Sequence, residues 1–198
     1  MNTAELKEYL AADLYRHKGR KGTAAMLKTL RKNRSFKITF WLRLAQWGRQ
    51  SAPPGLKQLL RWQYRRVCRR YCVDLPETTQ IGKGLIIYHC YGLVVNGKSL
   101  IGDNVMLAHQ ITLADEQGKA PIIGDRVRIA PGAKVIGGVE IGEGVVVGAN
   151  CVVVKDVPPH TVTVGIPNRV IPHPYDDDAE RYYWPPTAWT TKEPLSAE

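Results

Sequence analysis

Two histidines, His89 and His109, stand out because each lies eight residues after the start of a similar stretch, counted from Ile81 and Ile101. Each is also the third residue of a six-residue unit. Histidine titrates near neutral pH, so an exposed imidazole can take the proton of a hydroxyl group as a general base. The two positions therefore predict a site for acid–base chemistry if both rings face outward.

A repeat of six residues must position these histidines. Apolar residues recur every six positions from Ile123 to Val153, and a second apolar or small residue follows each one four positions later. Strands alternate with a period of two and helices with 3.6, so a period of six indicates short strands joined by tight turns. Three units form one triangular coil, in which the first and fifth residues point inward and the third points outward. The two histidines are expected to stack on one outer face, roughly 5 Å apart.

The repeat is interrupted twice. Residues 99–100 add two positions between coils, and the segment Ala114–Pro121 leaves the repeat before Ile123. An excursion from a solenoid is usually a functional loop.

Other chemistry fits the same residues less well. A zinc site needs at least three protein ligands, and the next positions in the histidine column are Pro131 and Ala149. The four cysteines match no zinc motif and are expected to be reduced structural thiols. Cys90, beside His89, is at a turn position, which disfavours an acyl-enzyme. No metal is predicted, and two surface histidines without a role remain the alternative.

The first part of the chain predicts helices over Thr3–Tyr15, Gly22–Trp47 and Gly55–Cys72, with a break at Ser51–Gly55. Up to Cys72 there are 18 lysines and arginines against three acidic residues, whereas the remainder has 10 against 15. The partner of the basic region is therefore a separate question from the chemistry of the repeat.

Length and composition favour one core with extensions: 198 residues, of which 44% are hydrophobic. We expect a helical region over 1–72, a repeat domain over 73–172 and a tail over 173–198. No apolar run approaches the roughly 20 residues of a membrane span, and the N-terminus has no signal-peptide core. The predicted location is the cytoplasm, with peripheral contact at the inner face of the membrane as an option.

Two stretches and the repeat carry a resemblance to a known family. VDLPETTQIGKGLIIYHCYGLVV (73–95) and VPPHTVTVGIPNRVI (157–171) resemble the hexapeptide-repeat acyltransferases, especially serine acetyltransferases and their sugar-modifying relatives. The resemblance implies a mainly β chain, a left-handed parallel β-helix preceded by an α-helical region. It also implies acetyl-CoA as the donor co-substrate and a homotrimer with active sites between subunits.

The resemblance further implies site roles. His89 matches the catalytic base, and Asp74 matches the aspartate that orients it. Such a carboxylate fixes the tautomer and stabilises the imidazolium, and the acceptor attacks acetyl-CoA directly. For acetyl-CoA, small residues at Pro131 and Ala149 suit the pantetheine arm; the candidate phosphate-binding cations are Lys134, Lys155 and Arg169.

Departures from the serine enzymes point to another acceptor. Tyr88 stands where they carry an aspartate, and Lys119-Ala120-Pro121 stands where they carry Arg-His-Pro. Together with His109, Tyr88 and Lys119 are expected to bind a saccharide, either polysaccharide, nucleotide-linked or lipid-linked. The alternative enzyme is a serine O-acetyltransferase of cysteine biosynthesis.

The basic helices leave a different class open, a non-catalytic protein that binds nucleic acid or a membrane surface. No nucleic-acid motif is present, so no nucleic-acid partner is predicted. Trp41, Trp47 and Trp62 are interleaved with the cations, which favours contact with an anionic membrane or a lipid-linked acceptor. A solvated basic face is the alternative.

Overall fold

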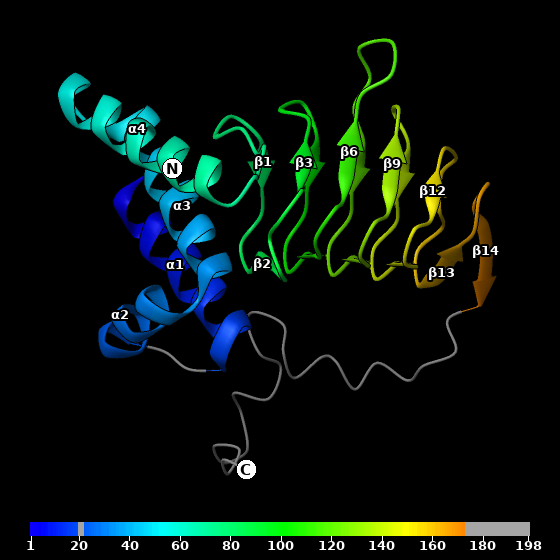
Figure 1. The fold of residues 1–198 in the computed structure, drawn as a ribbon, viewed down its shortest axis with the longest axis horizontal. Coiled ribbons are helices and arrows are strands. Elements are labelled where there is room, and N and C mark those ends of the chain that lie inside the picture. Colours follow the sequence, from blue (N-terminus) through cyan, green and yellow to red (C-terminus); the bar gives the residue numbers. More distant parts are fainter. Residues whose placement is uncertain (20–21, 173–198) are drawn as a thin grey trace.

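The computed structural model describes residues 1–19 and 22–172, and it consists of a helical end followed by a column of stacked coils (Figure 1). Four helices precede the coils: α1 Thr3–Lys18, α2 Thr23–Lys32, α3 Arg34–Ser51 and α4 Pro54–Arg70. The predicted division at 72/73 stays a prediction, and the predicted tail from 173 lies outside the described residues. No helix among the described residues is long and apolar enough to cross a membrane.

The predicted helix over Gly22–Trp47 is wrong, because two helices occupy this range. Asn33 has an extended backbone, with φ −106° and ψ 114°, and ends α2. Its side chain accepts a hydrogen bond of 2.9 Å from the backbone N–H of Phe36 and so caps the start of α3. Asparagine is a favoured residue at this position because its side-chain oxygen satisfies a free N–H of the first turn.

The strands form three sheets, one for each side of a triangular prism. The first contains β1 Gln80–Ile81, β4 Leu100–Ile101, β7 Ile122–Ile123 and β10 Glu140–Ile141. The second contains β2 Ile86–Ile87, β5 Met106–Leu107, β8 Arg128–Ile129, β11 Val146–Val147, β13 Thr161–Val164 and β14 Arg169–Pro172. The third contains β3 Val94–Val95, β6 Thr112–Ala114, β9 Lys134–Ile136 and β12 Val152–Val153.

All strand pairs are parallel except β13 with β14, which confirms the predicted parallel coils. Equivalent residues of successive coils lie directly over one another, as Ile101 does over Ile123. The inward residues form one continuous apolar core. Corner residues such as Asn104 and Asn150 have left-handed backbones, with φ of 59° and 55°. Asparagine tolerates this conformation, so the sharp corners are formed at low cost.

The placement of the two added residues at 99–100 is also wrong. Ile87 pairs with Leu107, and Val95 pairs with Leu113. In the first coil, eight positions separate Ile87 from Val95, whereas in the second coil six positions separate Leu107 from Leu113. The additional two residues therefore lie in the corner between β2 and β3, which contains His89. Both placements give the same length from Ile81 to Ile101, so spacing alone does not distinguish them.

The helices cap the open end of the first coil with a buried ion pair. Arg43 and Asp13 are fully buried, with 2.9 Å between Nε and Oδ2. The Arg43 guanidinium donates to the carbonyl oxygens of Ile81 and Gly82 at 2.9 and 2.6 Å. Asp13 accepts from the backbone N–H of Leu85 at 2.8 Å. These bonds satisfy backbone groups that a preceding coil would otherwise satisfy.

Candidate functional site

The two histidines meet at the corner between the second and third sheets. Their ring centroids are 5.8 Å apart and the ring planes are inclined by 87°, so one ring presents its edge to the other. His89 is exposed and His109 is partly buried. The Nδ1 atom of His109 is enclosed and has no hydrogen-bond partner among the described residues. The expected proximity of the two rings is thus found in the structure.

The two additional residues of this corner turn the side chain of His89 outward from the coil. The left-handed backbone of His89, with φ 53°, departs from the strand direction. Gln110 donates its N–H to the Tyr91 carbonyl at 2.9 Å, while Gly132 donates to the His109 carbonyl at 3.1 Å. Tyr91, and not His89, therefore occupies the backbone position equivalent to His109.

The helical end braces this corner. The Arg34 guanidinium donates to the Tyr91 hydroxyl at 2.7 Å, and the Tyr91 ring contacts the Tyr71 ring edge-on, with centroids 6.2 Å apart. Arg34, Tyr71 and Tyr91 were not predicted from the sequence. An aromatic residue at position 91, where the repeat expects a buried small or aliphatic residue, was the one available signal.

Cys90 has a structural environment. Its side chain is buried, and it hydrogen-bonds to Ser35 of α3. Burial raises the pKa of the Cys90 thiol, which disfavours the thiolate that a nucleophile requires. That no acyl-enzyme forms here stays a prediction.

Asp74 lies beside the corner but is not bonded to His89. Its backbone N–H donates to the Leu93 carbonyl and its carbonyl accepts from Val95, both at 2.8 Å, which attaches it to the edge of the third sheet. The carboxylate is exposed, and among the described residues no hydrogen bond joins it to the His89 imidazole. The pairing of Asp74 with His89 stays a prediction.

A column of small residues continues from His109 along the same corner. The N–H of Asn150 donates to the Pro131 carbonyl at 2.9 Å, which stacks the corner of Ala149 on that of Pro131. Both Pro131 and Ala149 are exposed. They leave the corner free of bulky side chains, which fits the predicted pantetheine contact.

The three candidate phosphate-binding cations lie at different places. Lys134, on β9, is beside the column, and its Nζ donates to the Gln110 carbonyl at 2.6 Å. Lys155 follows β12 at the corner that leads to the first sheet, and Arg169 is at the start of β14. Of the two lysines, Lys134 is therefore the one beside the column, whereas Arg169 pairs with Val164 in the coil that follows Ala149.

The loop over 114–121 is a short hairpin at another corner. Glu116 and Lys119 exchange two backbone hydrogen bonds of 3.0 Å, and the loop projects beyond β6 (Figure 1). It connects the third sheet to the first, whereas the histidines are between the second and third. The expectation that Lys119 joins Tyr88 and His109 is therefore not met within one chain.

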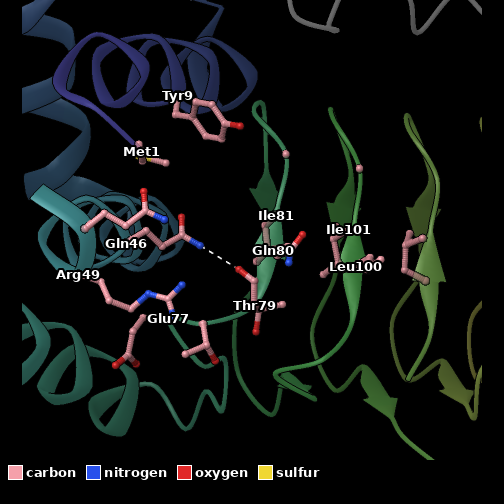
Figure 2. A pocket seen from close by; sticks show the side chains of 15 residues that line it. Met1, Tyr9, Gln46, Arg49, Glu77, Thr79, Gln80, Ile81, Leu100 and Ile101 are labelled. Atoms are coloured by element: carbon pink, nitrogen blue, oxygen red, sulfur yellow. Dashed lines mark hydrogen bonds between the residues drawn. The ribbon is translucent and has the colours of Figure 1, made fainter. Parts of the chain in front are cut away.

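A cavity of about 470 Å³ lies on the first sheet, against α1 and α3 (Figure 2). In it, Gln46 Nε2 donates to the Thr79 carbonyl at 3.0 Å, with Arg49 and Glu77 nearby. None of its lining residues is a histidine, and it faces a different side of the prism from His89. Within residues 1–19 and 22–172, no group of three metal-ligating side chains occurs.

Both a protein-family model and curated proteins match this chain. Residues 120–155 match the model of the bacterial transferase hexapeptide family (six repeats). The serine acetyltransferase of Salmonella typhimurium is 32% identical over 156 residues, which cover 76% of this chain and 54% of that protein. The chain thus spans about half the length of the curated relatives it matches.

Solved structures are similar over more of the fold. Soybean serine acetyltransferase complexed with serine is 32% identical, with a TM-score of 0.72 over 85% of this chain and 70% of that one. Serine acetyltransferase from Brucella abortus in complex with coenzyme A is 26% identical, with a TM-score of 0.73 over 86% of this chain and 69% of that one.

Proposed function

The chain belongs to the hexapeptide-repeat acyltransferases, the left-handed parallel β-helix family that contains the serine acetyltransferases, and on this premise we propose that it transfers acetyl from acetyl-CoA to a hydroxyl group. The observation that carries the proposal is the exposed His89, edge-on to His109, at the head of a column of small residues. A non-catalytic binding protein would leave this arrangement without a role.

In the proposed reaction His89 is the general base. The acceptor oxygen forms a bond to the thioester carbonyl carbon while its proton moves to an unprotonated nitrogen of the His89 imidazole. The carbon–sulfur bond then breaks, and His89 returns the proton to the departing CoA sulfur. Asp74 is proposed to orient the imidazole, and His109, whose ring lies edge-on to that of His89, to hydrogen-bond the acceptor.

Acetyl-CoA is proposed to lie along the corner from His109 past Pro131 and Ala149. The absence of long side chains at these two positions supports a close approach of the pantetheine arm to the backbone. Lys134 lies beside this path, and Lys134, Lys155 and Arg169 are proposed as contacts of the CoA phosphates.

L-Serine is the acceptor that the relatives favour. The matched proteins are serine acetyltransferases, and one structure contains serine. The relatives named above are serine acetyltransferases and do not support the saccharide predicted from the sequence. That second candidate rests on Tyr88, which is 48% exposed beside His89 and offers a ring for sugar stacking where an ammonium-binding carboxylate is expected in a serine site.

We further propose a homotrimer. Leu100 and Ile122 pair on neighbouring strands of the first sheet, and their outward side chains are 39% and 43% exposed. A neighbouring copy would bury this apolar pair. A heterologous contact related by a threefold rotation closes into a ring of three, in which the loop of one chain is proposed to approach the histidine corner of the next.

Contact with an anionic membrane is also proposed, through the outer face of α4. Leu59 and Trp62 are 58% and 51% exposed there, and Arg65, Arg66 and Arg69 are exposed on the same helix. Apolar side chains flanked by cations suit the headgroup region of an anionic bilayer. Flotation with anionic vesicles at low salt should recover the protein, and its absence from the vesicle fraction would refute this contact.

The direct test of the proposed function is release of the CoA thiol from acetyl-CoA. We expect release with L-serine present and little release without an acceptor. No acceptor-dependent release with L-serine or with a panel of saccharides would reject the proposed activity.

A further inference from the structure

A basic and aromatic groove lies between α3 and α4, with one wall from α2. Its volume is about 530 Å³. Three cations line it, Lys37, Arg66 and Arg70, together with the aromatic residues Phe40, Trp41 and Tyr71. None of the described residues that line it is acidic. We call this cavity the α3–α4 groove.

The cations of the groove lack acidic partners. Among the described residues, no ion pair involves Lys37, Arg66 or Arg70. Arg66 instead lies over the Trp62 ring at 5.5 Å. Like charges gathered at one cavity repel one another, and the attraction of each cation to a bound anion would offset this repulsion. Arginine forks match the oxygen geometry of phosphate.

The rest of the groove is apolar and aromatic. Phe40 and Trp41 contact each other edge-on, with centroids 5.6 Å apart, and Leu30 and Val67 add aliphatic surface. Aromatic side chains at a cavity wall favour a planar ring or a hydrocarbon chain as the neighbour. A phosphate ion alone would leave this surface unused.

The groove leads toward the histidine corner. Tyr71 lines the groove and contacts the ring of Tyr91, two residues after His89. On α3, Arg34 is one turn before Lys37, on the same side of the helix, and donates to the Tyr91 hydroxyl. A row of cations therefore runs from the groove to the corner that carries the proposed base.

We propose that the α3–α4 groove binds a ligand that carries phosphate or pyrophosphate on an aromatic or hydrocarbon group. Nucleotides and isoprenoid pyrophosphates are both ligands of this kind. Each carries phosphate groups for the cations of the groove and an apolar or aromatic group for its aromatic wall. Binding of this ligand to the α3–α4 groove is independent of the proposed acetyl transfer, because it does not require acetyl-CoA.

The test is calorimetric titration of the full-length protein, without acetyl-CoA, at fixed low ionic strength. The probes are UDP, farnesyl pyrophosphate and inorganic pyrophosphate. We expect UDP or farnesyl pyrophosphate to bind more tightly than inorganic pyrophosphate, and the tighter of the two identifies the source of the ligand. The double variant Lys37→Gln/Arg70→Gln should weaken that binding by roughly tenfold or more, because charge-assisted hydrogen bonds are lost.

Lys28→Gln is the matched control. Lys28 is exposed on α2 and carries the same charge, but it does not line the groove. Its replacement should leave the affinity within about twofold, since only long-range attraction changes. Three results would each overturn the proposal: no binding of the substituted probes, equally tight binding of inorganic pyrophosphate, or equal weakening by Lys28→Gln. Thermal melts of the variants, which remove only exposed or half-exposed unpaired cations, verify that they are folded.

Discussion

The rings of His89 and His109 lie 5.8 Å apart although the two residues are not equivalent in the coils. By backbone register, His109 is equivalent to Tyr91. The dipeptide His89-Cys90 is the local insertion, and it sends the imidazole outward while the thiol is buried against α3. The corner thus presents one exposed and one partly enclosed histidine to the same space, an arrangement that suits one proton acceptor and one hydrogen-bonding group.

Replacing the proposed orienting carboxylate should reduce turnover without abolishing it. Asp74→Asn keeps the shape and the backbone bonds to the third sheet but removes the charge that stabilises an imidazolium. We expect a fall in kcat that is smaller than that of a variant lacking His89, with KM for acetyl-CoA little changed. Steady-state kinetics measures both, and an unchanged kcat would remove Asp74 from the mechanism.

Acceptor choice is measured by kcat/KM for L-serine and a panel of saccharides at equal acetyl-CoA. From the relatives we expect L-serine to be used. The variant Tyr88→Asp restores the residue expected in a serine site and should raise kcat/KM for L-serine. If a saccharide is used and L-serine is not, the second candidate acceptor replaces the first.

The proposed trimer depends on the apolar pair of the first sheet. Leu100→Glu places a charge on a side chain that is 39% exposed in the single chain, and burying it in an interface would be costly. Light scattering should give three chains for the native protein and a smaller mass for the variant. Lys98→Glu, an exposed cation in the same turn region, is the control that should keep the native mass.

The buried pair Asp13–Arg43 should dominate the stability of the helical cap. Arg43→Met leaves the Asp13 carboxylate buried without its partner and leaves two carbonyls of the first coil without donors. We expect a loss of about 3–5 kcal/mol in the free energy of unfolding. Denaturant unfolding measures this loss, and Lys28→Met on the exposed side of α2 should change stability little. A stable Arg43→Met variant would contradict the capping role.

The repeat was predictable because every inward position from Ile123 to Val153 obeys it without a gap. Where the repeat is irregular, prediction failed for a physical reason. Apolar residues at Leu93, Val94 and Val95 fit two registers, so the position of the insertion depends on which strand pairs with β6. Asn33 ends a helix through its backbone conformation and capping bond, which the amphipathic pattern does not reveal.

The site was predictable only in part. The corners that carry His89 and His109 are stacked by the repeat, whereas the insertion that turns His89 outward does not follow from the repeat. Lys119 is on a loop, and its place relative to them depends on the corner from which the loop leaves and on neighbouring chains. Arg34 and Tyr71 reach the corner through helix packing, which involves contacts between distant parts of the chain that no local pattern records.

The central claim is that His89 removes the acceptor proton during acetyl transfer from acetyl-CoA. The most direct measurement compares acceptor-dependent CoA release by the native protein and by His89→Ala, with His160→Asn as a control at an exposed histidine outside the site. We expect a loss of on the order of 10²–10⁴-fold in kcat for His89→Ala, unchanged circular dichroism, and near-native turnover for His160→Asn. Near-native turnover in a folded His89→Ala protein would contradict it.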